Sequence, residues 1–359
     1  MSVKALFLLA AGSVLGVLDA MPLPSLISQA DAIVVGAETA PVTAGKTVTF
    51  YLTVERVFTG AIGQGSTVNV VWNSDINPDA WAGSPSYRGI WFLRKGAGNE
   101  WQCVPAAIRG NVRPFSDLSL PVSNGPLPPQ LAYDDNTTPL LDKLVFEVGA
   151  SQPSDPTLFR HVTSGVSSPA VLKALRYLAS SQSTGAASAG LAGLIERGDV
   201  AALLQAEKIL ANLSPGDSNA GVLSSAIFTA FRTPDPEAVA SLGRMASGKG
   251  SPRLQVAAAA ALAAIHSADA VPWLGSLLSD SQQQVQIYGA QGLSFFANGV
   301  GIPTAETTKQ LTHLNERQPT SYRTAETDRH IGPLTGQPEP FLDFWRGWWQ
   351  QHPELHAQQ

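Results

Sequence analysis

Residues 251–266 have the sequence SPRLQVAAAAALAAIH, in which the larger apolar side chains recur at the spacing of an α-helix. One face of this helix carries Leu254, Ala258, Leu262 and Ile265. A second stretch, QQQVQIYGAQGLSFFA at residues 282–297, has matching side chains 31 residues later, at Val285, Gly289, Leu293 and Phe296. Because similarity at a fixed period is typical of repeat architectures, the two stretches predict helices that stack on one another.

The helices before these two stretches repeat as well. Residues 238–243, AVASLG, match residues 270–275, AVPWLG, at an offset of 32. The longer stretch DAVPWLGSLL at residues 269–278 resembles the first helix of HEAT or PBS-lyase-type repeats, whose pattern is Asp-Ala-Val-Pro-x-Leu-x-x-Leu-Leu. The resemblance implies an α-solenoid, in which each helix pair buries its apolar face against its neighbours and the array has a concave side.

Helical spacing begins at Thr138 and Pro139 and continues to about residue 298. Less regular amphipathic helices are expected upstream of the clear repeats, at residues 169–181, 200–213 and 219–232. We therefore predict a HEAT-like α-solenoid over residues 137–315.

The period changes to two between residues 30 and 115, where β-branched and aromatic residues are common. Five strands are expected there, at residues 32–36, 47–57, 67–72, 89–94 and 101–104. We predict a small β-barrel or β-sandwich over residues 21–115. Residues 116–136 are rich in Pro, Ser, Asn and Gly and are predicted to be a linker. The expected fold class is thus a multidomain β + α chain, a barrel or sandwich followed by a solenoid.

Two segments of the β region carry a second resemblance. The sequence ADAIVVG at residues 30–36 and the strand that ends VERVFTG at residues 54–60 look like the opening of the OB-like barrel of netrin modules and tissue inhibitors of metalloproteinases. The resemblance implies protease inhibition or ligand binding. However, the inhibitors of that family use cysteines at the mature N-terminus, and this chain has none there, so the inhibitory role is not carried over.

The first twenty residues have the pattern of a secretory signal peptide, with Lys4, an uncharged apolar run at residues 5–18 and a small residue at Ala20. We expect an exported protein, periplasmic or extracellular, without an integral membrane span after cleavage. The lone Cys103 can form no internal disulfide and is expected to be a small buried side chain. Charged residues make up 14% of the chain and the net charge is −5, which disfavours nucleic acid and anionic lipid as partners.

Residues 316–359 are predicted to be an extended tail that ends in an aromatic helix. One stripe of this helix carries Phe341, Phe344, Trp345, Trp348 and Trp349. Such large side chains must be covered, and two interpretations remain open: the helix caps the repeat array, or it anchors a partner or a membrane surface.

Two stretches approach known catalytic motifs without completing them. The sequence GRMASGKGS at residues 243–251 lacks the Ser or Thr directly after Lys249 that a P-loop needs, so an inter-helix turn is expected. In HPELH at residues 352–356, Pro353 breaks the helix that a zinc-protease motif requires, so a frayed polar tail is expected. We expect no catalytic residue, no metal and no cofactor.

The connection between the third and fourth strands offers a candidate ligand loop. Residues 75–79 alternate oxygen-bearing side chains as a calcium loop does, but Ala80 and Ser86 replace the required glycine and glutamate. A hydrated polar loop is therefore expected, with an opportunistic calcium site as the alternative. The same loop carries Trp81 and Tyr87, which either contact a ligand or pack on the rim of the barrel.

The function that these patterns favour is an exported, non-enzymatic scaffold that binds an unknown protein partner on the concave helical face and the loop at residues 73–88. The candidate partner-binding residues are Trp81, Tyr87, Trp273, Tyr288, Trp345, Trp348 and Trp349. A secreted protease inhibitor that acts through the N-terminal domain is the alternative. An enzyme whose site residues are scattered along the fold is a third hypothesis.

Overall fold

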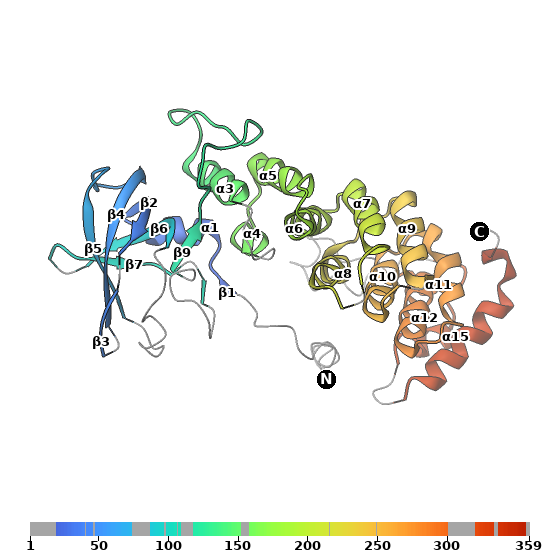
Figure 1. Cartoon of the computed structure of the whole chain (residues 1–359). Helices are drawn as coiled ribbons and strands as arrows, with labels where there is room; N and C mark the ends of the chain where they lie inside the picture. The colour runs from blue at the N-terminus through green and yellow to red at the C-terminus, as the bar shows by residue number, and fades with distance from the viewer. Residues whose placement is uncertain are drawn as a thin grey trace. The chain divides into compact units, whose positions relative to one another are not determined.

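A computed structural model describes residues 19–39, 41–45, 47–73, 87–96, 98–105, 107–108, 118–151, 158–214, 216–248, 250–300, 320–333 and 337–356. The chain forms two compact units, Met1–Ser181 and Gln182–Gln359. Strands and their covering helices belong to the first unit, and stacked helices make up the second (Figure 1). The predicted order of a β region followed by an α region is confirmed.

The β region is a closed barrel, which decides between the barrel and the sandwich. Five strands follow one another in the order β2 (Ala32–Glu38), β4 (Thr47–Thr59), β5 (Thr67–Asn73), β7 (Trp101–Cys103) and β6 (Arg88–Lys95), and β6 pairs back with β2. The β5–β7 pairing is parallel, and the other pairings around the barrel are antiparallel. A short strand, β3 (Val42–Ala44), extends the sheet beside β4.

The barrel interior follows from the alternation along β4. Val48, Phe50, Leu52 and Val54 all point into the buried core. Trp91 fills the centre, where its ring lies 5.3 Å from that of Phe50 and its Nε1–H donates to the Gly36 carbonyl at 3.0 Å. Cys103 lies in the same core, as expected, and burial raises the pKa of its thiol, so the reactive thiolate is disfavoured.

Strands β2 and β6 both carry unbroken runs of buried residues, and a helix covers β6 on the outside of the barrel. Leu23 and Leu26 of α1 (Leu23–Gln29) have no exposed area, and α1 contacts both β6 and α3 (Leu140–Ala150). Strand β9 (Ser119–Pro121) pairs with β6 on the same side. This corrects the predicted linker, since Leu118, Leu120 and Val122 lie within residues 116–136 and are all buried.

An ion pair joins the barrel to the first long helix. Glu147 of α3 is nearly inaccessible, and its Oε1 lies 2.6 Å from Arg56 Nη2 of β4. The Tyr133 hydroxyl donates to the same oxygen at 2.8 Å, and burial together with the Glu147 charge raises the pKa of Tyr133. The remaining elements of this unit are β1 (Asp19–Ala20), β8 (Ala107–Ile108), α4 (Leu158–Val162) and α5 (Pro169–Ala179).

The second unit stacks its helices in two layers (Figure 1). One layer contains α6 (Thr184–Ile195), α8 (Ser218–Ala230), α10 (Pro252–Ile265) and α12 (Gln283–Ala297). The other contains α7 (Val200–Leu210), α9 (Pro236–Ser247) and α11 (Val271–Leu277), which follows the short 3-10 turn η3 (Ala268–Ala270). The helices begin where the sequence supplies capping side chains: Ser183, Asp199, Asp217, Asp235 and Ser251 each accept a backbone N–H.

The aromatic helix α15 (Glu339–Gln351) packs against α12. Trp345 and Trp348 are buried, and the Trp345 Nε1–H donates to the His330 carbonyl at 2.9 Å. Arg346 reaches α12 as well, since its Nη2 donates to Gln286 Oε1 at 2.8 Å. Of the two interpretations of this helix, the packing is that of a cap on the array.

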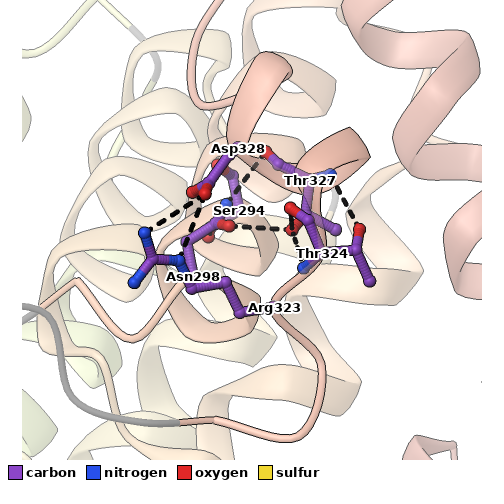
Figure 2. A network of polar contacts seen from close by, with 6 residues as sticks. All are labelled: Ser294, Asn298, Arg323, Thr324, Thr327 and Asp328. Atoms are coloured by element: carbon purple, nitrogen blue, oxygen red, sulfur yellow. Dashed lines mark hydrogen bonds and ion pairs between the residues drawn. The ribbon is translucent and has the colours of Figure 1, made fainter.

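A polar network attaches the preceding segment, residues 320–333, to the end of α12 (Figure 2). Asn298 and Thr327 are buried; Asn298 Nδ2 donates to the Thr327 carbonyl at 3.1 Å, and Thr327 Oγ1 donates to Asn298 Oδ1 at 2.8 Å. Thr324 and Thr327 form a reciprocal capping box at the start of α14 (Ala325–Arg329). Because the buried groups satisfy one another, we interpret the network as structural.

Candidate binding surface

Tryptophan rings lie against glycines of neighbouring helices at two places in the array. The Trp273 ring of α11 covers Gly243 of α9, where an added Cβ would be 2.1 Å from Trp273 Cδ2. The Trp349 ring of α15 covers Gly275 of α11, where an added Cβ would be 2.2 Å from the ring. The two glycines occupy the same position in the repeated sequence, 32 residues apart, so α15 continues the packing of the layer that contains α9 and α11.

A hollow of about 550 Å³ lies along the contact between α9 and α11. It is lined by Pro236, Val239, Ala240 and Ser247 of α9 and by Asp269, Trp273 and Ser276 of η3 and α11. Trp273 and Ser276 are three residues apart on α11 and so lie on one side of that helix, and Asp269 lies in the η3 turn directly before it. We call this hollow the α9/α11 groove.

The charge of the α9/α11 groove is negative. Asp269 is the charged member of its lining, and its carboxylate is exposed. Glu237, in the first turn of α9, occupies the equivalent position one repeat earlier and is exposed too. Arg244 of α9 is committed elsewhere, since its Nε and Nη2 lie 2.7 and 2.8 Å from the two carboxylate oxygens of Glu207 on α7.

A second hollow, of about 450 Å³, lies between α7, α8, α9 and the start of α10. Its charged members are Glu207 and Arg244. Hydrogen bonds from Arg244 and from Ser241 Oγ, the latter at 2.7 Å, hold the pKa of Glu207 below its usual value despite burial. The two charges neutralise each other, so this hollow offers a ligand little electrostatic preference.

The barrel also exposes large apolar side chains, a feature that sequence reasoning missed. Val42 of β3 and Tyr51 of β4 are 68% and 54% exposed. Both lie on strands of the barrel wall next to Thr49, which pairs with Val42 and lies two residues before Tyr51. The alternation along β4 was the available signal, because Tyr51 falls between the inward-facing Phe50 and Leu52.

The aromatic residues named as partner-binding candidates have different surroundings. Trp81, together with the possible calcium loop at residues 75–79, lies outside the described residues. Tyr87 packs against the barrel core, and its backbone N–H donates to Glu38 Oε1 at 2.8 Å. Tyr288 of α12 meets Phe228 of α8 edge-on, with ring centroids 6.3 Å apart, so the rings of two helices that flank α10 touch.

Of the candidates in the helical unit, Trp273 alone lines the α9/α11 groove. Trp345 and Trp348 are buried where α15 packs against the array, and their ring centroids lie 5.2 Å apart. Trp349 lies between Gly275 and the imidazole of His356, which stacks on it with a centroid distance of 4.0 Å. The frayed tail expected at residues 352–356 is thus corrected, because His356 also bonds through Nε2 to the Trp349 carbonyl at 2.9 Å.

The described part of the chain contains no group of three or more His, Cys, Asp or Glu side chains that could hold a metal ion. The P-loop-like stretch begins inside α9, at Gly243, and runs into the turn before α10, as expected. Within the described residues, no helix is both long and apolar enough to cross a bilayer.

No family model, no curated protein and no solved structure matches this chain.

Proposed function

We propose that this protein is a non-enzymatic scaffold that binds a partner protein on its helical array. The observation that supports the proposal best is the α9/α11 groove, an open apolar hollow that holds a half-buried tryptophan and one exposed carboxylate. Half-exposed aromatic side chains in hollows are the usual anchors of protein interfaces. Stacked helix pairs also offer long surfaces whose neighbouring units can each contribute contacts.

The two resemblances are consistent with this role. The repeat offset and the two-layered stack support a HEAT-like solenoid, a fold used widely to hold other proteins. The barrel order β2-β4-β5-β7-β6, closed by β2–β6 and with β5 parallel to β7, supports an OB-like barrel, a fold that binds ligands on its wall. Exposed Tyr51 and Val42 give that wall a second surface for contact.

Affinity purification tests the proposed function. The tagged full-length protein is expressed in the organism that makes it, and proteins that remain bound after a stringent wash are identified. We expect one specific partner in stoichiometric amount. The absence of such a partner, combined with turnover of a substrate by the purified protein, would overturn the proposal.

We also propose that the protein is exported and that its first twenty residues are removed. Leu23 and Leu26 have no exposed area and cover the barrel through α1, so cleavage beyond Leu26 would remove both side chains and uncover β6. Cleavage after Ala20 leaves α1 intact. N-terminal sequencing of the protein isolated from its native source is expected to begin at Met21. A sequence that begins at Met1 on protein from the cell interior would contradict export.

A further inference from the structure

The two tryptophan–glycine contacts differ in whether another ring of the chain stacks on the tryptophan. At α15, the indole of Trp349 is held between Gly275 and the imidazole of His356. At α11, the indole of Trp273 lies against Gly243, and Trp273 also lines the α9/α11 groove. The described residues include no ring that stacks on Trp273. The protein's own tail therefore illustrates what kind of group fits on such a tryptophan: a flat, nitrogen-bearing ring that can carry positive charge.

The surroundings of Trp273 favour a positively charged group as the one that stacks on its ring. Asp269, in the η3 turn four residues before Trp273, lines the same groove, and its exposed carboxylate makes no ion pair within the described chain. The described lining of the groove contains no basic side chain. Arg244 of α9 pairs with Glu207 on the α7 side of that helix. A cation that stacks on the indole would thus gain both the attraction of the ring and that of the carboxylate.

We propose that the α9/α11 groove binds an arginine side chain presented by an extended segment of the partner protein. Arginine fits better than lysine because its planar guanidinium stacks on an indole face and donates two parallel hydrogen bonds to a carboxylate. Apolar residues that flank the arginine lie against Pro236 and Ala240, which are the more exposed apolar side chains of the lining. This inference rests on the proposed function, since it names the chemistry by which the scaffold recognises its partner.

The binding of two synthetic peptides to the full-length protein tests this proposal. The first is acetyl-Leu-Arg-Leu-amide, and the second replaces arginine by citrulline, which has nearly the same shape but no charge. Binding is followed through the indole N–H signals in ¹⁵N NMR spectra, with the Trp273 signal assigned from the variant Trp273→Phe. The Trp349 signal is an internal control, because His356 covers that ring.

We expect the arginine peptide to shift the Trp273 signal in a saturable way and to leave the Trp349 signal in place. The citrulline peptide should bind about two- to fivefold more weakly, as expected for the loss of a partly exposed cation–π contact and ion pair. Equal binding of the two peptides, or a response at Trp349 but not at Trp273, overturns the proposal.

A matched pair of variants tests whether Asp269 supplies the carboxylate that binds the arginine. Asp269→Asn should weaken the binding of the arginine peptide about two- to fivefold. Glu237→Gln removes the same charge from the equivalent position one repeat earlier, where Ser241 stands in place of the tryptophan, and should change binding by less than half as much. Equal effects of the two variants overturn the assignment. Recovery of a partner by affinity purification bears only on the proposed function, whereas the peptide titration decides the groove whether or not a partner is found.

Discussion

Gly243 and Gly275 are the residues on which the packing of the α9, α11 and α15 layer depends. Each has a tryptophan ring where another residue would have its Cβ. Interiors pack at crystal-like density, so a ring this close leaves no room for a methyl group. The sequence carried a signal for this arrangement, because both glycines occupy the same place in the repeat. Which ring fills the space could not be predicted, since Trp349 is 74 residues from Gly275.

Gly243→Ala should therefore lower the free energy of unfolding by about 1–3 kcal/mol, as overpacking of a tight site does. Gly347→Ala is the control, because a Cβ at Gly347 meets no atom within 4 Å. Alanine has a higher helix propensity than glycine, so this control should be neutral or stabilising by up to about 1 kcal/mol. Urea unfolding of both variants measures the difference, and equal stability of the two would refute the packing described here.

His266 makes the stability of the helical unit depend on pH. It ends α10 in a left-handed conformation with φ of 53°, and its ring packs on Phe295 at 5.1 Å. Burial lowers the pKa of His266 to about 4, although a hydrogen bond to the backbone of Val300 opposes this shift. The pKa is depressed in the folded state, so stability is fully present above about pH 6.5 and is lost as the pH falls toward 4.

Between pH 7 and pH 4, protonation of His266 in the unfolded chain should lower the free energy of unfolding by on the order of 2 kcal/mol, after allowance for partial exposure. His266→Asn keeps a residue that tolerates the left-handed conformation and removes the titration. We expect the wild type to lose more stability than this variant across that pH range in parallel denaturant titrations. Identical pH dependence in both proteins would show that the ring does not titrate between these limits.

At the scale of elements, α14 and α15 close the array in different ways. The aromatic side chains of α15 supply apolar burial, and Asn298 and Thr327 supply buried hydrogen bonds (Figure 2). Terminal units of stacked helices need such covering because one of their faces has no neighbouring repeat. The aromatic stripe of α15 was predictable from its spacing, but the polar network was not, because it joins residues 29 positions apart.

Asn298→Ala should destabilise the protein by about 1–3 kcal/mol, since it removes two buried hydrogen bonds between Asn298 and Thr327. The matched control is Asn212→Ala. Asn298 donates to the Ser294 carbonyl four residues earlier at 3.0 Å, and Asn212 makes the equivalent bond to the Lys208 carbonyl at 2.8 Å, but on the surface. The control should change stability by less than about 0.5 kcal/mol. Hydrogen exchange should also become faster at residues 320–333 in the first variant alone. Unchanged exchange there would mean that the network does not hold the segment.

The limits of prediction differ between helices and strands for a physical reason. Long amphipathic helices and the long strand β4 were predicted because their periods persist over many residues. Strand β9 was missed because three residues among prolines and serines are too few to establish an alternation. The α9/α11 groove depends on how closely two helices approach each other, and no periodicity encodes that distance.

At the scale of the whole molecule, the five strands that close the barrel lie within the predicted domain at residues 21–115, but part of their cover does not. That segment lacks β9, which pairs with β6, and α3, which packs against α1 and β9. Ile90 and Phe92 of β6, both fully buried in the intact chain, would lose part of their cover.

We expect a fragment of residues 21–181 to unfold cooperatively on heating and a fragment of residues 21–115 to aggregate or to lack a cooperative transition. Differential scanning calorimetry with near-ultraviolet circular dichroism distinguishes the two. If the shorter fragment is as stable as the longer one, β9 and the helices are not part of the barrel's folding unit.

The central claim is that the helical array holds a partner protein at the α9/α11 groove. The most direct measurement is site-specific photo-crosslinking in the organism that makes the protein, with p-benzoylphenylalanine in place of Ser276. Ser276 lines the groove and is exposed; Arg329 of α14 is exposed but lies outside that lining and serves as the control position. We expect one defined protein adduct from position 276 and none from position 329. No adduct at either position, or the same adducts at both, would contradict the claim.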